Sequence, residues 1–282
     1  LVIGFAETAT AIALETAISL NHAMYVECTT RENNAASEFS YFTESHSHAT
    51  EQRIDTRNYK EVLREVDRVV FVEDEVTTGN TIMKLVDILK TRYANDSIRF
   101  TISSLLNSMS EDREKEISEF GMDCIYIKKL LFEYHIEKIS EVIGCADTCW
   151  NAQSSLKCSI HIRDITMDMN QRVLTPVVDY RKQVDSYVEQ VIADLKDELQ
   201  GNVLVLGTEE FMHPAIHLSA KIAESRLCDR VKTHSTTRSP IAASPEADYP
   251  FHDRYELKSL YDRERITFLY NIGVFDRVFI VT

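Results

Sequence analysis

The sequence predicts an α/β protein in which a parallel sheet is flanked by helices and a second, related α/β unit follows. Three observations predict this class. Short apolar runs alternate with stretches of helical periodicity, 44% of the residues are hydrophobic while 27% are charged, and the pattern of the N-terminal part starts again near residue 203. Strands that alternate with helices form a parallel sheet that binds ligands at the carboxyl ends of its strands.

The elements of the first unit follow from this alternation of apolar runs and helical periodicity. The predicted strands are residues 1–3, 69–72, 98–106 and 124–127. The predicted helices are residues 8–20, 59–66, 81–93 and 111–120. Because the chain opens directly on an apolar strand, we expect further residues upstream of Leu1 to complete this domain.

The second unit begins after a stretch with little periodicity, residues 144–168, which we interpret as an interdomain connection. A strongly periodic helix is predicted over residues 179–199, with Gly201 as its C-terminal stop, and a strand follows at residues 203–206. We therefore expect one domain over residues 1–150 and a second over residues 151–282 that ends incomplete at its C-terminus.

Short matches in the same order indicate that the two units are related. They are Val2-Ile3-Gly4 with Val205-Leu206-Gly207, Thr29-Thr30-Arg31 with Thr236-Thr237-Arg238, and Asp67-Arg68-Val69 with Asp276-Arg277-Val278. Their offsets are nearly constant, which predicts a duplicated arrangement of strands and helices.

Composition excludes several classes of function. With 31 Lys and Arg against 45 Asp and Glu, the net charge of −14 repels a nucleic-acid backbone. The sequence has no apolar run of about 18 residues, the length that a membrane span needs. Its six cysteines lack paired C-x-x-C spacing, so we expect reduced thiols in a cytoplasmic protein.

The segment 69–81 carries the clearest chemical pattern, with a buried strand, adjacent acids and a small polar loop that leads into a helix. Carboxylates at Glu73 and Asp74 suit the neighbouring hydroxyls of a ribose. Backbone amides of the loop and the N-terminus of the following helix suit a phosphate, and Gly79 allows the backbone to approach it closely. Ordinary solvated acids before a capped helix are the alternative.

This segment resembles the binding motif for 5-phosphoribosyl-1-pyrophosphate (PRPP) in type I phosphoribosyltransferases. Together with segments 4–10, 46–50 and 236–240, it is similar to the orotate phosphoribosyltransferase-like proteins of bacterial tellurium-resistance gene clusters. In those proteins the transferase domain is followed by a domain named for its Thr-Arg-Ser-Pro signature, which stands here at residues 237–240.

The resemblance implies a magnesium-dependent transfer of ribose 5-phosphate from PRPP to a nitrogenous acceptor in the synthesis of a nucleotide-like metabolite. Glu73 and Asp74 would hold the ribose hydroxyls and the Mg²⁺ ion. The residues implied to cradle the 5-phosphate are Thr77, Thr78, Gly79, Asn80 and Thr81. The residues implied to lie at the pyrophosphate are Ala6, Glu7 and Thr8. The alternative for Glu7 is that it caps its own helix.

The segment 31–57 is polar and aromatic with few periodic apolar positions, and it stands where this fold places a mobile loop over the reacting sugar. His46 and His48 are candidate catalytic residues that stabilise the departing pyrophosphate or move a proton, and Glu75 is a third candidate. Arg31 is a candidate ligand of a phosphate or a carboxylate. Exposed loop histidines and a surface arginine are the alternatives.

Polar loop positions of the first unit are repeated in the second. They are Thr208, Glu209, Glu210, Thr236, Thr237, Arg238 and Ser239. Since a core does not need polar loop residues, their repetition favours a second or shared ligand site, and the alternative is a duplicate kept for packing. For the chain as a whole we expect an enzyme, with a PRPP-binding or nucleotide-binding regulator as the alternative, and we allow for a homodimer.

Overall fold

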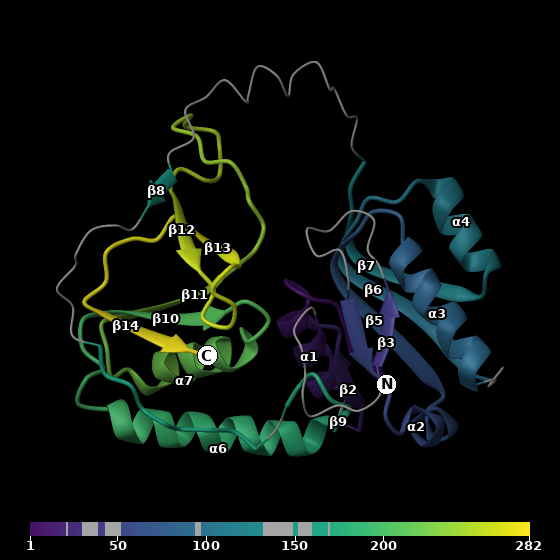
Figure 1. Ribbon diagram of the computed structural model, residues 1–282, viewed down its shortest axis with the longest axis horizontal. Coiled ribbons are helices and arrows are strands. Elements are labelled where there is room, and N and C mark those ends of the chain that lie inside the picture. The colour runs from purple at the N-terminus through teal and green to yellow at the C-terminus, as the bar shows by residue number, and fades with distance from the viewer. Residues whose placement is uncertain are drawn as a thin grey trace. The chain divides into compact units, whose positions relative to one another are not determined.

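The computed structural model shows two compact units (Figure 1). The first contains Leu1–Phe132 and Met167–Gln183, and the second contains Glu133–Thr166 and Val184–Thr282. The chain therefore leaves the first unit and returns to it before it completes the second. The residues that the structure describes are 1–20, 22–29, 39–42, 52–93, 97–131, 149–151, 160–168 and 170–282.

The first unit is built on a six-stranded sheet with the strand order β7-β6-β5-β1-β2-β9. Neighbouring strands run parallel from β7 to β2, and β9 joins the edge antiparallel to β2. The strands are β1 (Val2–Gly4), β2 (Met24–Glu27), β5 (Arg68–Val76), β6 (Arg99–Asn107), β7 (Met122–Lys129) and β9 (Thr175–Pro176). This sheet confirms the fold class that the sequence predicts.

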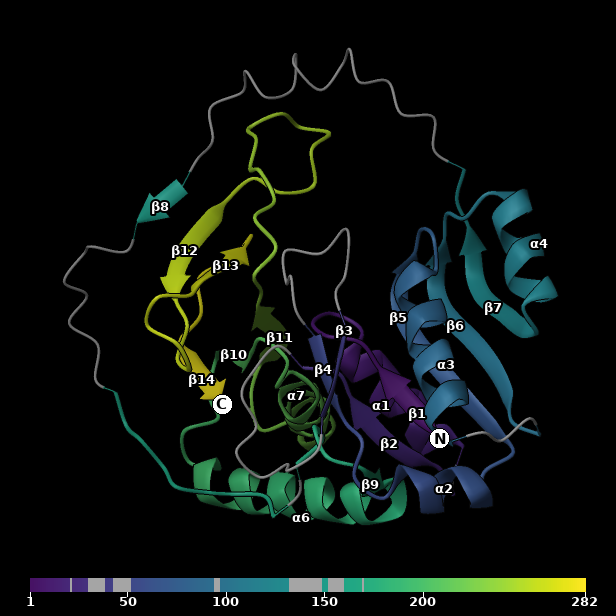
Figure 2. The same ribbon diagram turned by 45° about the vertical axis from the view of Figure 1, so that its right-hand side comes forward.

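Helices cover both faces of this sheet (Figures 1 and 2). They are α1 (Thr10–Ser19), α2 (Tyr59–Glu65), α3 (Asn80–Tyr93) and α4 (Glu111–Glu119). On the face of α3 and α4, Phe71 of β5 and Ile102 of β6 belong to the main apolar core. On the other face α1 packs close to β1, since a Cβ at Gly4 would lie 2.6 Å from the Cβ of Ala13. Gly4 thus sets the distance between the strand and its helix.

The segment 31–57, which we expected to be a loop, contains an antiparallel hairpin of β3 (Phe39–Phe42) and β4 (Gln52–Asp55). Phe42 and Ile54 bury their side chains in the core of the first unit. The prediction of a loop was wrong for these residues because each strand spans only four residues. So short a run has too few apolar positions to show a period of two.

The second unit contains two three-stranded sheets. One is parallel, with the order β11-β10-β14, and helix α7 packs against it. The other has the order β13-β12-β8, and within it β12 and β13 pair antiparallel. The elements are β8 (Cys149–Asn151), β10 (Asn202–Thr208), α7 (His213–Ser225), β11 (Arg230–Thr236), β12 (Arg254–Lys258), β13 (Ile266–Tyr270) and β14 (Arg277–Val281).

Two features along residues 149–201 differ from the sequence-based expectation. Helix α6 (Val177–Leu195) ends six residues before Gly201, the predicted stop. Gly201 instead leads into β10 with a φ of 65°, and its Cα lies so close to Asp276 that a Cβ would be 2.4 Å from the carboxylate. Strand β8 lies in the stretch that we interpreted as a connection, and it pairs with β12.

The strand pairings around Gly4 and Gly207 follow the same arrangement, as the predicted relation between the two units requires. Gly4 pairs with Val72 of β5, and Gly207 pairs with Val281 of β14 at the same position after the first residue of that strand. In each unit a helix follows the glycine strand, and the next strand pairs parallel on the opposite side. The predicted pair of Arg31 with Arg238 lies outside the described residues, because Arg31 is not among them.

Candidate functional site

The acidic motif lies at the topological switch point of the first sheet. From β1 the chain moves outward to β2, whereas from β5 it moves outward in the opposite direction to β6 and β7. The carboxyl ends of β1 and β5 therefore face a shared crevice, which is where open α/β sheets bind ligands. Glu73 and Asp74 stand near the end of β5, which continues to Val76, and both side chains are half-buried.

A direct contact joins the two loops at this crevice. The hydroxyl of Thr8, in the β1–α1 loop, donates a hydrogen bond of 2.6 Å to Oδ2 of Asp74. The carboxylates also accept bonds from the motif's own backbone, since Glu73 accepts from the amide of Asp74 and Asp74 accepts from the amide of Glu75. These contacts fix the orientation of the acids while leaving them partly accessible to a ligand.

The β1–α1 loop is held by bonds to its carbonyl oxygens. The side-chain amide of Gln52, a buried residue of β4, donates to the carbonyl of Ala6 over 3.2 Å. The hydroxyl of Thr10 donates to the carbonyl of Glu7 over 3.0 Å. The peptide bond between Ala6 and Glu7 is cis. Ala6 and Glu7 are half-buried and Thr8 is exposed, so the end of this loop is accessible.

The polar loop after β5 ends at a glycine in the left-handed region. Gly79 has a φ of 67°, and a Cβ there would lie 2.9 Å from Cδ1 of Ile117. Its carbonyl accepts the amide of Met83, which closes the first turn of α3. Helix α3 has no acidic residue in its first turn, so the positive end of its dipole is not offset by a side chain there. Asn80 and Thr81 are the first two residues of this helix.

Two residues from the β6–α4 region contact the motif, and no pattern of neighbouring residues predicts either contact. Ser108 donates its hydroxyl to the Glu75 carboxylate over 2.8 Å. Arg113 donates to the carbonyl of Thr78 over 2.7 Å and to the side-chain oxygen of Asn80 over 2.5 Å. These residues lie more than 30 positions downstream of the motif, so only the fold brings them to it.

Three predicted site residues lie outside the residues that the structure describes. They are Arg31, His46 and His48. Their roles stay predictions. Glu75 is described, and its exposed carboxylate turns to Ser108 while the carboxylate of Asp74 turns to Thr8.

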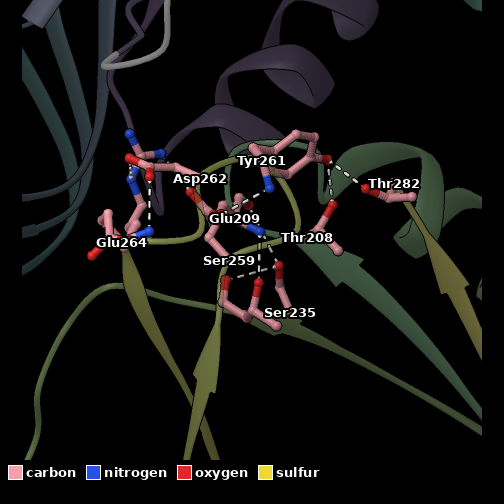
Figure 3. Close-up of polar contacts among 10 residues, drawn as sticks. Thr208, Glu209, Ser235, Ser259, Tyr261, Asp262, Glu264 and Thr282 are labelled. Atoms are coloured by element: carbon pink, nitrogen blue, oxygen red, sulfur yellow. Dashed lines mark hydrogen bonds and ion pairs between the residues drawn. The ribbon is translucent and has the colours of Figure 1, made fainter.

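Of the second-unit positions, Thr208, Glu209 and Thr236 belong to a polar cluster at the carboxyl ends of β10, β11 and β14 (Figure 3). Glu209 is 2% exposed and has a φ of 52°. Its carboxylate accepts bonds from Ser259 (2.5 Å) and Arg265 (3.0 Å), and its amide donates to the hydroxyl of Thr236 (3.0 Å). The ion pair of Glu209 and Arg265 ties the β10–α7 loop to the loop between β12 and β13.

The same cluster includes a tyrosine between two strand ends. The hydroxyl of Tyr261 lies 2.5 Å from that of Thr208 and accepts a bond of 2.9 Å from Thr282 (Figure 3). Thr237 pairs through its backbone with Phe268 of β13. Glu210 is buried as well, while Thr237, Arg238 and Ser239 are half-buried. The chain thus uses many of these polar groups for its own contacts, and a second ligand site here stays a prediction.

The implied Mg²⁺ ion fits the donors at the crevice. Within the described part of the chain, no group of three His, Cys, Asp or Glu side chains is placed to hold a metal by itself. Glu73 and Asp74 offer hard carboxylate oxygens, and Mg²⁺ commonly binds through one or two carboxylates together with water and substrate phosphates. The donor set therefore suits an ion that arrives with a phosphorylated ligand. Among the described residues no helix is both long and apolar enough to cross a membrane.

Comparison with known families agrees with this geometry. Residues 1–129, which contain the switch-point crevice, match the family described as phosphoribosyl transferase. Residues 177–282 match the family described as the TRSP domain C-terminal to that transferase domain. No curated protein matches the chain. The two matches follow one another in the order that the second description states, so the chain carries a phosphoribosyl transferase domain followed by a TRSP domain.

Proposed function

We propose that the first unit binds PRPP with Mg²⁺ and transfers its ribose 5-phosphate to a nitrogenous acceptor, with release of pyrophosphate. The observation that carries this proposal is the hydrogen bond between Thr8 and Asp74 at the switch point. It brings the loop suited to pyrophosphate next to the acids suited to ribose. One PRPP molecule carries both groups, so it can contact both elements at once.

Each part of the ligand has a matching part of the crevice. The 5-phosphate would lie at residues 77–81, where the N-terminus of α3 supplies backbone amides and a favourable dipole. The ribose hydroxyls would donate to Glu73 and Asp74. The pyrophosphate would lie at residues 6–8, with the charge of Mg²⁺ offsetting its own.

The chemistry asked of the protein is mainly positioning. The lone pair of the acceptor nitrogen attacks C1 of the ribose, the bond from C1 to the pyrophosphate oxygen breaks, and pyrophosphate leaves with the bonding electrons. The acceptor nitrogen gives its proton to a base or to water. Fixed donors stabilise the charges that develop, and Mg²⁺ would stabilise the negative charge on pyrophosphate. Glu75, His46 and His48 are our candidates for moving the proton.

A regulator that binds PRPP without turnover is the second candidate. The observation that favours it is Glu7, whose carboxylate belongs to the loop at which pyrophosphate would lie. A negative charge there opposes the binding of pyrophosphate. Both candidates use the same ribose-phosphate site, so turnover distinguishes them.

The test incubates the full-length chain with PRPP, Mg²⁺ and a panel of nitrogenous bases or a cell extract, and follows pyrophosphate release. We expect release that depends on an acceptor and stops in a Glu73→Ala, Asp74→Ala double variant. The matched control is a Glu111→Ala, Asp112→Ala double variant, which removes the same charge from exposed positions of the same unit. PRPP binding without release would favour the regulator, and equal PRPP affinity in both double variants would contradict the site.

We also propose the wider role that the resemblance implies, the cytoplasmic synthesis of a nucleotide-like metabolite linked to tellurium resistance, by a chain that forms a homodimer. Growth on tellurite with and without the chain tests the first part. Sedimentation of the purified chain tests the second.

A further inference from the structure

Helix α4 contacts the polar loop at residues 77–81 through two side chains one turn apart. Ile117 lies against Gly79, because its Cδ1 would be 2.9 Å from a Cβ built on that glycine. Arg113, four residues earlier on the same face of α4, reaches the loop with its guanidinium. The start of α4 is itself fixed, since the N-cap hydroxyl of Ser110 accepts the amide of Arg113.

The guanidinium of Arg113 contacts the loop at two points. Nε donates to the carbonyl of Thr78 over 2.7 Å, and a terminal nitrogen donates to the side-chain oxygen of Asn80 over 2.5 Å. The same terminal nitrogen lies 2.9 Å from the sulfur of Met83 in α3. A planar fork with several fixed donors can hold these acceptors together, which a lysine ammonium cannot do in the same geometry.

The bond to Thr78 sets the direction of the next amide. In a trans peptide the carbonyl and the following N–H point in opposite directions. Because the Thr78 carbonyl points to Arg113 on α4, the amide of Gly79 points away from α4. An anion bound by this loop needs backbone amides in a fixed direction. By its bond to the Thr78 carbonyl, Arg113 fixes the direction of the Gly79 amide, which is one of the donors to that anion.

The charge of Arg113 is already matched within the protein. Its other terminal nitrogen donates to Glu116 over 2.6 Å, and its side chain is 23% exposed. An ion pair of this kind leaves little net charge to attract a phosphate over a distance. The effect of Arg113 on a ligand therefore comes from the orientation of the loop.

We infer that Arg113 is a positioning residue for the 5-phosphate of the phosphoribosyl ligand, acting through the peptide between Thr78 and Gly79. The inference rests on the proposed function, since it assigns the 5-phosphate to residues 77–81. The inference distinguishes between ligands, because Arg113 contacts the loop assigned to the 5-phosphate while the pyrophosphate is assigned to residues 6–8. Ligands with a 5-phosphate should depend on Arg113, and inorganic pyrophosphate should not.

The experiment measures the affinities of PRPP, ribose 5-phosphate and inorganic pyrophosphate, each with Mg²⁺, by calorimetry on the full chain. In Arg113→Ala we expect PRPP and ribose 5-phosphate to bind about tenfold more weakly, and pyrophosphate to change less than about twofold. Arg113→Lys keeps the charge and the stem, and we expect it to bind the phosphoribosyl ligands nearly as weakly as Arg113→Ala. Glu116→Gln keeps both loop contacts and should bind as the wild type does.

Several results would overturn the inference. Wild-type affinity for ribose 5-phosphate in Arg113→Ala or full rescue by lysine would show that the fork geometry is not needed. Equal weakening of all three ligands would show a general structural role. If Arg113→Ala does not fold, Arg113→Lys decides between these results. A wild-type chain that binds neither PRPP nor ribose 5-phosphate would overturn the proposed function itself, which separates that failure from a failure of Arg113 alone.

Discussion

Thr8 donates its hydroxyl hydrogen to Oδ2 of Asp74 across 66 residues of sequence, and this bond joins the two loops at the switch point of the first sheet. The loops follow neighbouring strands, β1 and β5, which pair in parallel register. Because the bond is only 2.6 Å long and ends on a carboxylate, it is of the stronger, charge-assisted kind. The acid is thereby held toward the loop that we assign to pyrophosphate.

We predict that Thr8→Val weakens the binding of PRPP with Mg²⁺ by about three- to tenfold, since one hydrogen bond to a charged group is lost and Asp74 is free to turn away. Calorimetry measures the change. Thr16→Val is the matched control, because Thr16 bonds within α1 through its hydroxyl to the carbonyl of Ile12. Equal affinities of the two variants would show that the contact does not matter for PRPP.

Gly79 allows a second test of the polar loop. Gly79→Ala places a Cβ at a φ of 67° and at 2.9 Å from Ile117, so we expect a loss of stability of about 1–3 kcal/mol and weaker binding of ribose 5-phosphate. Gly121→Ala is the control, since its φ is 90° but a Cβ there would have no neighbour within 4 Å. Urea unfolding and calorimetry compare the two. A larger loss in Gly121→Ala would contradict the steric argument.

For His46 and His48 we predict an effect on turnover that exceeds the effect on binding. A group that meets the substrate at the transition state lowers kcat when it is removed, with little change in the affinity for PRPP. A His46→Ala, His48→Ala double variant should therefore lose on the order of a hundredfold in kcat. Steady-state kinetics and calorimetry test this together. Unchanged turnover would mean that neither histidine takes part, and lost PRPP affinity would make them ligands of the ground state.

Replacing one member of the ion pair of Glu209 and Arg265 should cost more unfolding free energy than replacing the other. Glu209 is 2% exposed, whereas the side chain of Arg265 is 21% exposed and can gain hydration when its partner is neutral. We therefore expect Arg265→Met, which leaves a buried carboxylate without its cation, to cost about 2–4 kcal/mol of unfolding free energy. Glu209→Gln should cost about 1 kcal/mol, because it leaves the more exposed charge.

Urea unfolding followed by circular dichroism measures these losses. Arg263→Met is the control, since Arg263 is an exposed arginine of the same loop, and it should change stability by less than about 0.5 kcal/mol. If Glu209→Gln costs more than Arg265→Met, the hydrogen bonds of Glu209 outweigh its charge.

Strands and helices could be predicted where neighbouring residues in the sequence carry a clear pattern. Strand β6 and helix α3 match the predicted ranges to within about a residue at each end, because apolar residues at alternate positions specify the strand and a clear helical period specifies the helix. The hairpin of β3 and β4 was not predicted, because each of its short strands depends on pairing with the other and not on a pattern of its own. Strand β12 has a polar sequence and depends in the same way on pairing with β13.

The sequence by itself determined the alternation of strands and helices, the relation between the two units and the acidic motif of Glu73 and Asp74, because each is a pattern of neighbouring residues. The tertiary structure alone decided which distant groups meet that motif. Thr8, Ser108 and Arg113 reach it only because β1, β5 and β6 lie side by side in the sheet and α4 packs beneath the loop. A hydrogen bond acts over about 3 Å, and residues far apart in sequence come that close only when the chain has folded.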